Sequence, residues 1–288
     1  PVQFWLPATY ANAPAPVAAL FAIMTKVGAY AILRVHTISF GPDLPATAGV
    51  GDTWLFPAAI VTIILGAFGV LGARRLMPLI AFSVVGSMGT LLVAVSMFSP
   101  DATTAALYYL IHSTFAAACL FLIADLVVTQ RASDTLIPKP ATLQNGLFAA
   151  LFFAAAIAMA GMPPLSGFLG KLLVLDALRE PGVMGWAWSA ILVGSLLTIV
   201  GFARAGSALF WKSTAPSVVA TQTEPGLDGD AVAPAGPMQI APTMAALALL
   251  AGLAIFAGPV ATYLEATSAQ LFDRAGYVAA VLNPAEEG

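Results

Sequence analysis

The sequence has few of the residues that cover a soluble protein or build its redox and metal sites. Only 9% of its 288 residues are charged, and it contains one cysteine and two histidines. Soluble domains average about 25% charged residues, so this chain has too little polar surface to cover a soluble fold. A single cysteine cannot form an internal disulfide, and so few Cys and His residues argue against iron–sulfur, haem and clustered metal sites. We therefore expect no cofactor and no metal.

The motifs of soluble enzymes are also missing. The chain has no phosphate-binding loop, no dinucleotide fingerprint and no catalytic constellation, so we do not expect an enzyme. Its net charge of −3 is small and predicts no nucleic-acid partner. The chain begins at Pro1 with no basic stretch ahead of a short apolar core, so we expect no signal peptide, and we expect the chain to be a fragment whose N-terminal part is missing.

Long apolar runs dominate what is present. The composition is 60% hydrophobic, and the mean hydropathy is +0.92. A membrane-spanning helix needs about 20 mostly apolar residues. The sequence therefore predicts an all-α, polytopic membrane protein with about seven transmembrane helices, one of them broken by proline. The predicted spans are 14–35, 53–72, 76–98, 103–129, 146–177, 184–211 and 240–264.

The connections between these spans predict the topology. We expect one transmembrane domain over 1–288, a flexible cytoplasmic loop at 213–238 and a C-terminal tail at 266–288 that can form a short interfacial helix. Because cytoplasmic loops are enriched in Lys and Arg, the charge bias places the 1–13 end in the cytoplasm. One side carries Arg74, Arg75, Arg131, Lys139 and Lys212, and the other carries Arg34, Arg179 and Arg274.

Lys26 lies near the centre of the first span. A charged side chain at that depth costs roughly 2.5–3.5 kcal/mol on insertion scales, so it is a candidate for an ion or proton pathway. Tyr30 and Arg34 follow at i+4 and i+8, and this face could line a hydrated route. The alternative is a lysine whose ammonium reaches the interface. About 12 residues, or ~18 Å of helix, separate it from the cytoplasmic end and weaken that alternative.

Other polar side chains lie within the spans. His112 is near the middle of the fourth span, with Tyr108 one turn before it, and it is a candidate proton relay because histidine titrates near neutral pH. The alternative is a neutral core histidine bonded to a neighbouring helix. Arg204, in the sixth span, is either a pathway residue or an interfacial anchor. The small residues of Ser83–Gly89 predict close helix packing.

The fifth span contains the predicted helix break. Pro163 and Pro164 remove two backbone donors, and Gly167 follows in the same motif. Non-helical backbone at membrane depth is tolerated where protein or a water-filled cavity covers it, and broken helices of transporters often form ion sites. Lys171 lies just beyond the break and is a third pathway candidate. The alternative is a simple proline kink followed by an interfacial lysine.

Several stretches of the chain resemble a known family. Pro1–Pro7, Met24–Tyr30, and Gly161–Phe168 with Lys171 resemble the proton-translocating, antiporter-like subunits shared by respiratory complex I and Mrp-type Na⁺/H⁺ antiporters. The stretch around His112 is similar to the histidine-bearing central helix of that family. The resemblance covers nearly the whole chain.

The resemblance implies a fold of about fourteen helices in two inverted repeats, of which this chain is the second half. It implies a hydrated polar axis at the membrane midplane, with Lys26 as the connecting lysine, His112 as a relay and Lys171 as the terminal lysine. It further implies a multi-subunit antiporter complex in a bacterial inner membrane. The partners would be the other subunits and membrane lipid, with H⁺ as the transported ion and Na⁺ as a second candidate.

Departures from the family pattern separate the alternatives. Arg74–Pro78 replaces the Asp and Lys usual in complex I members and favours the Mrp type, while Ala116 stands where some members have a lysine. The alternative function is a proton-pumping membrane subunit of complex I or of a membrane hydrogenase. A third hypothesis is a scaffold that binds partner subunits and has lost transport.

Overall fold

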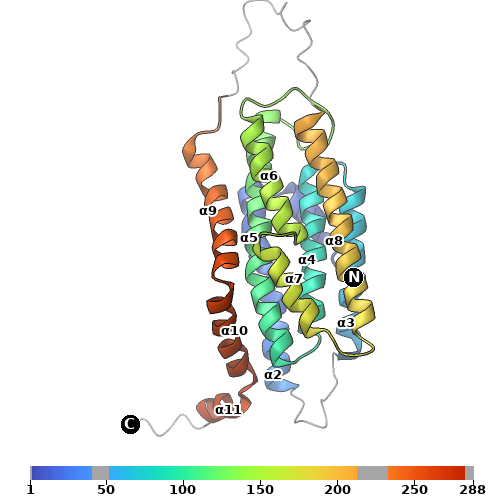
Figure 1. Cartoon of the computed structure of the whole chain (residues 1–288), viewed down its shortest axis with the longest axis vertical. Helices are drawn as coiled ribbons and strands as arrows, with labels where there is room; N and C mark the ends of the chain where they lie inside the picture. Colours follow the sequence, from blue (N-terminus) through green and yellow to red (C-terminus); the bar gives the residue numbers. More distant parts are fainter. Residues whose placement is uncertain (1, 41–51, 213–232, 283–288) are drawn as a thin grey trace, which may run out of the picture.

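The computed structural model describes residues 2–40, 52–212 and 233–282, and in these ranges the chain forms a bundle of helices (Figure 1). Most helices run along the long axis of the bundle, while α11 lies across one end. In chain order the helices are α1 (Trp5–Asn12), α2 (Ala15–Ser39), α3 (Asp52–Gly72), α4 (Leu76–Val95), α5 (Pro100–Arg131), α6 (Asn145–Ala160), α7 (Ser166–Ala177), α8 (Met184–Gly206) with the π-helical turn η1 (Ser207–Trp211), α9 (Pro237–Ile255), α10 (Ala257–Phe272) and α11 (Arg274–Leu282).

The helices match the predicted membrane architecture. Six of the described helices are long and apolar enough to cross a membrane: α2, α3, α4, α5, α8 with η1, and α9. The predicted fifth span, 146–177, is the pair α6 and α7, which follow one another along the bundle. The predicted all-α, polytopic membrane fold is confirmed.

Two elements differ from the predicted spans. The short helix α1 precedes the first span and packs against α2 and α4, although no helix was expected there. The predicted span 240–264 is two helices, because α9 ends at Ile255 and α10 begins at Ala257. Pro259 has no N–H to donate to Ile255, so an uninterrupted helix would leave that carbonyl without its partner.

Only parts of the two predicted segments 213–238 and 266–288 lie within the described residues. Helix α9 already begins at Pro237, inside the predicted 213–238 loop, while residues 213–232 of that loop lie outside the described residues. Helix α10 continues to Phe272 and α11 follows it, within the predicted tail at 266–288. The guanidinium of Arg34 on α2 lies 4.7 Å from the ring centroid of Tyr277, and this cation–π contact holds α11 against the bundle.

Helix α5 is the central element. It packs against α2, α4, α6, α7, α9 and α10. Its start is well specified, because the Ser99 hydroxyl accepts a hydrogen bond from the Ala102 amide at 3.3 Å and Pro100 is the first helical residue. At its other end, Ala132 follows the last helical residue and has a positive φ of 50°. Residues on different faces of α5 therefore contact six other helices of the bundle.

Helices α3 and α4 approach each other closely at glycines. A Cβ atom on Gly66 would lie 2.4 Å from the backbone nitrogen of Gly86. A Cβ atom on Gly89 would lie 2.6 Å from the backbone nitrogen of Ile63. Only residues without a side chain fit at these contacts, so the close packing predicted for Ser83–Gly89 is confirmed.

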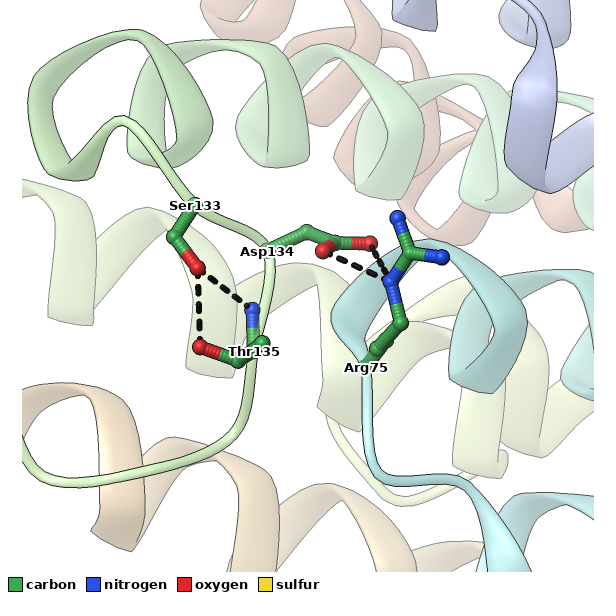
Figure 2. A network of polar contacts seen from close by, with 4 residues as sticks. All are labelled: Arg75, Ser133, Asp134 and Thr135. Atoms are coloured by element: carbon green, nitrogen blue, oxygen red, sulfur yellow. Dashed lines mark hydrogen bonds and ion pairs between the residues drawn. The ribbon is translucent and has the colours of Figure 1, made fainter.

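An ion pair between Arg75 and Asp134 joins two inter-helix connections at one end of the bundle (Figure 2). The Arg75 Nε atom lies 2.8 Å from Asp134 Oδ1 and 3.0 Å from Oδ2, which links the α3–α4 turn to the α5–α6 connection. Beside it, the Ser133 hydroxyl accepts a hydrogen bond from the Thr135 amide at 3.2 Å. Arg131 is buried and donates to the Leu209 carbonyl at 2.9 Å. Arg75 and Arg131 thus each hold a connection at this end of the bundle, Arg75 through Asp134 and Arg131 through the Leu209 carbonyl.

Candidate functional site

Lys26 lies inside the bundle. Its side chain is only 1% exposed, on the face of α2 that also buries Ala22 and Ala29 and packs against α5. Among the described residues its Nζ atom has no hydrogen-bond partner. Because the side chain is buried, its ammonium group does not reach the membrane interface, which rules out the snorkelling alternative. A buried ammonium group without hydrogen-bond partners is energetically costly. Lys26 is therefore a buried titratable group whose N–H donors are unpaired among the described residues.

The helix break lies between α6 and α7. Gly161 follows the last residue of α6 with a φ of +80°, a conformation that favours glycine, and α7 begins at Ser166. The peptide bond between Pro163 and Pro164 is cis. The connection contains both prolines of the predicted break, and these two residues are exposed. The last residue of α6, Ala160, and the first residue of α7, Ser166, are buried, so these two helix ends lie inside the bundle. Such helix ends need partners from elsewhere.

Lys171 supplies a partner for the end of α6. Its Nζ atom donates to the carbonyl oxygen of Ala160, the last residue of α6, at 2.7 Å. It also donates to the hydroxyl of Ser195 on α8 at 2.6 Å. A cation at a helix C-terminus is stabilised by the helix dipole. The lysine therefore folds back across the break and is held inside the bundle, which a simple kink with an interfacial lysine would not produce.

His112 contacts the other end of the break. Its ring is fully buried, and Nδ1 lies 2.9 Å from the hydroxyl of Ser166, the first residue of α7. Nε2 has no partner among the described residues. A Cβ atom on Gly167 would lie 2.8 Å from Nε2 and 2.0 Å from the carbonyl oxygen of Ala158. Gly167 thus allows the imidazole to approach the broken backbone.

The remaining predicted residues lie at the edge of this arrangement or outside it. Tyr108 is buried, and its hydroxyl donates to the carbonyl of Leu253 on α9 at 2.9 Å. Tyr30 is 44% exposed. Arg204 donates to the carbonyls of Val70 and Ala73 at the end of α3, at 3.3 and 2.8 Å. The structure brings His112 and Lys171 to one broken helix and leaves Tyr30 and Arg204 away from it.

Two serines of the site were not predicted. Ser166 and Ser195 contact His112 and Lys171 directly. Ser195 is one of several small polar residues in an apolar helix, and only its contact with α7 distinguishes it. The sequence signal for Ser166 is its place two residues after the proline pair, with Leu165 between them.

Comparison with known proteins agrees with this architecture. A family model described as NADH:quinone oxidoreductase/Mrp antiporter, TM, matches residues 1–198. A probable K(+)/H(+) antiporter subunit from Rhizobium meliloti is 32% identical over 94% of this chain and 53% of its own length. An Na(+)/H(+) antiporter subunit from Bacillus subtilis is 33% identical over 73% of this chain and 42% of its own length.

A solved structure supports the same relationship. A chain in the structure of the Mrp complex from Dietzia sp. superposes with a TM-score of 0.80 and 26% identity, covering 98% of this chain and 58% of that chain. The chain thus spans about half the length of the curated relatives it matches.

Proposed function

This chain belongs to the NADH:quinone oxidoreductase/Mrp antiporter transmembrane family, and from that premise we propose that it conducts protons within a subunit of a multi-subunit cation/H⁺ antiporter. Lys26, His112 and Lys171 are the groups that carry the protons. The complex would lie in a bacterial inner membrane, with the other antiporter subunits and lipid as partners. The relatives support the antiporter assignment, since both are named as antiporter subunits.

One observation carries the proposal. A titratable side chain contacts each end of the break: Lys171 donates to the last carbonyl of α6, and His112 contacts the hydroxyl of Ser166, the first residue of α7. A static structural role needs no titratable group, because serine or asparagine side chains can also satisfy helix ends. Groups that gain and lose protons at this position can change the hydrogen bonding of the break during transport.

The partners of each group suit proton exchange. The Ala160 carbonyl and the Ser195 hydroxyl both accept from Lys171, so they stabilise its ammonium form. The Ser166 hydroxyl can donate to or accept from His112, because it rotates to suit the ring. Lys26 retains free hydrogen-bonding capacity among the described residues. Moving one charge across 100 mV is worth roughly 2.3 kcal/mol, which is comparable to a few such hydrogen bonds.

Alanine variants in the full-length protein test this proposal. We expect Lys26→Ala, His112→Ala and Lys171→Ala each to abolish exchange in everted vesicles that contain the intact complex, assayed with Na⁺ and with K⁺. Lys139→Ala is a matched control, because Lys139 lies on the connection between α5 and α6. Equal assembly of all variants must be verified. Wild-type exchange in an assembled Lys26 or Lys171 variant would remove that residue from the pathway.

The family description itself provides a second candidate function. It names NADH:quinone oxidoreductase beside the Mrp antiporter, so the same proton groups could serve a redox-driven pump whose chemistry lies in other subunits. Purifying the complex from its host decides between the two. Co-purified antiporter subunits support the first function, and quinone-reductase or hydrogenase subunits support the second.

A further inference from the structure

A small cavity lies on the side of Lys171 that faces α4 and α8. Its volume is about 20 Å³, and it lies within the bundle between these helices and α3. A cavity that admits one water molecule needs roughly 10–15 Å³ and two to four polar partners. The polar side chains that line it are Ser83, Ser87, Thr90, Tyr109, Lys171, Ser195 and Thr198.

The hydroxyl groups of this cavity present acceptors to its interior. Four of them donate their own proton to a carbonyl of the same helix: Ser83 to Ile80 (2.7 Å), Ser87 to Val84 (2.9 Å), Thr90 to Gly86 (3.3 Å) and Thr198 to Gly194 (2.7 Å). Each hydroxyl has one proton and two lone pairs, so the oxygen lone pairs remain available. An acceptor-lined cavity favours an occupant that donates hydrogen bonds or carries positive charge.

Ser195 connects this cavity to the lysine. Its hydroxyl accepts from Lys171 Nζ at 2.6 Å, and it also lines the cavity. Within the described ranges of the chain, Ser195 makes no other side-chain hydrogen bond. Its own proton is therefore free to point into the cavity, where a water molecule could accept it.

We propose that this cavity holds one water molecule that exchanges a proton with Lys171 through the Ser195 hydroxyl. This inference rests on the proposed function, because it assumes that Lys171 releases a proton during transport. In the step, an N–H bond of the ammonium breaks and its proton forms a new O–H bond on Ser195. The original Ser195 proton passes to the water. The electron pair returns to the lysine nitrogen, leaving a neutral amine beside a protonated water.

The surrounding lone pairs stabilise that product. A protonated water donates three hydrogen bonds, and the serine and threonine hydroxyls of α4 and α8 supply acceptors for them. Electrostatic interactions with oriented dipoles are strong in a site with so little water. The Ser83–Gly89 stretch therefore has two roles: its glycines allow close packing, and its serines line the proton site.

Three variants test the inference in the intact complex. Ser195→Ala removes the relay hydroxyl, Ser195→Thr restores one, and the double variant Thr90→Val with Thr198→Val removes two acceptors at nearly constant volume. We expect exchange to fall at least about fivefold in the first and third, the effect of one lost hydrogen bond, and to recover in Ser195→Thr. Ser189→Ala is the control, because Ser189 is an exposed serine of the same helix.

A high-resolution density map supplies a second, independent readout. We expect an ordered water in the cavity of the wild-type complex and its loss in the double valine variant. An empty wild-type cavity, in a map that shows other buried waters, overturns the inference. So does wild-type exchange in both Ser195→Ala and the double variant while Lys171→Ala is inactive, and this result leaves the proposed function standing. Wild-type exchange in Lys171→Ala overturns both. If the double variant fails to assemble, the two Ser195 variants decide.

Discussion

The Nζ atom of Lys171 lies 2.7 Å from the carbonyl oxygen of Ala160, on the opposite side of the helix break. The lysine is the sixth residue of α7, and Ala160 is the last residue of α6. The side chain therefore reaches back along its own helix to the end of the preceding one. This contact places a titratable cation at the end of a helix inside the bundle, where the dipole favours it.

Substitution of Gly161 tests the close contact between the helix break and the Lys171 side chain. A Cβ atom at Gly161 would lie 2.6 Å from Lys171 Cδ, in addition to the strain of a φ of +80°. We expect Gly161→Ala to lower stability by about 1–2 kcal/mol and to reduce exchange per assembled complex. Gly182→Ala is a matched control, because Gly182 has a φ of +98° but no neighbour within 4 Å. It should lower thermal stability similarly and leave exchange unchanged. Equal exchange in both variants would argue against a role for this contact.

Substitution of Gly167 tests the close contact between the His112 imidazole and the helix break. We expect Gly167→Ala to destabilise the complex by about 1–3 kcal/mol, because its Cβ would lie 2.0 Å from the Ala158 carbonyl. Exchange should fall as well, since the same atom displaces the imidazole. Gly252→Ala, in the interior of α9 with open space around it, should be neutral or slightly stabilising. Thermal unfolding in detergent and vesicle exchange measure the two effects, and a stable, fully active Gly167→Ala would refute this packing argument.

Arg204 is expected to be an anchor. It donates to the Val70 and Ala73 carbonyls, which lie at the end of α3. We expect Arg204→Ala to lower the stability of the complex by about 1–3 kcal/mol, because these carbonyls lose a charged donor. Exchange per assembled complex should remain near the wild-type rate. A variant that assembles normally but has lost exchange would place Arg204 in the pathway instead.

The ion pair between Arg75 and Asp134 should contribute little to stability. The Arg75 side chain is 53% exposed, so solvent screens its interaction with the carboxylate. A double-mutant cycle with Arg75→Ala and Asp134→Ala should give a coupling energy of about 0.2–1 kcal/mol that decreases with added salt. Exchange should be unaffected in all three variants. A coupling energy of several kcal/mol would show that the ion pair stabilises this end of the bundle more than its exposure predicts.

Features of the site that depend on local sequence could be predicted. The depth of Lys26 follows from its place in an apolar run, and the break follows from the two missing donors of Pro163 and Pro164. The division of the last span at Ile255 and Ala257 was missed. Its local signal is Pro259, which lies within the first turn of α10, where a proline is tolerated.

Features that depend on contacts between distant residues could not be predicted. Ser195 and Lys171 are 24 residues apart, and their hydrogen bond exists because α7 and α8 pack together. The contact of Tyr108 with Leu253 joins residues 145 positions apart. Helical spacing also places Tyr30 on one polar face with Lys26, but a helical face is broad enough to leave Lys26 buried and Tyr30 exposed. Helical periodicity shows which residues share a face of a helix, but it does not show which neighbouring helix covers that face.

The central claim is that Lys26 and Lys171 release and regain protons, and replacement by arginine tests it most directly. Arginine keeps the positive charge but is not deprotonated in proteins. The decisive measurement is cation/H⁺ exchange in vesicles containing the full-length complex with Lys26→Arg or Lys171→Arg, normalised to assembly. The account predicts that exchange falls at least about tenfold, equivalent to ~1.4 kcal/mol in the barrier. Wild-type exchange with arginine at both positions would contradict it, because a fixed charge would then suffice.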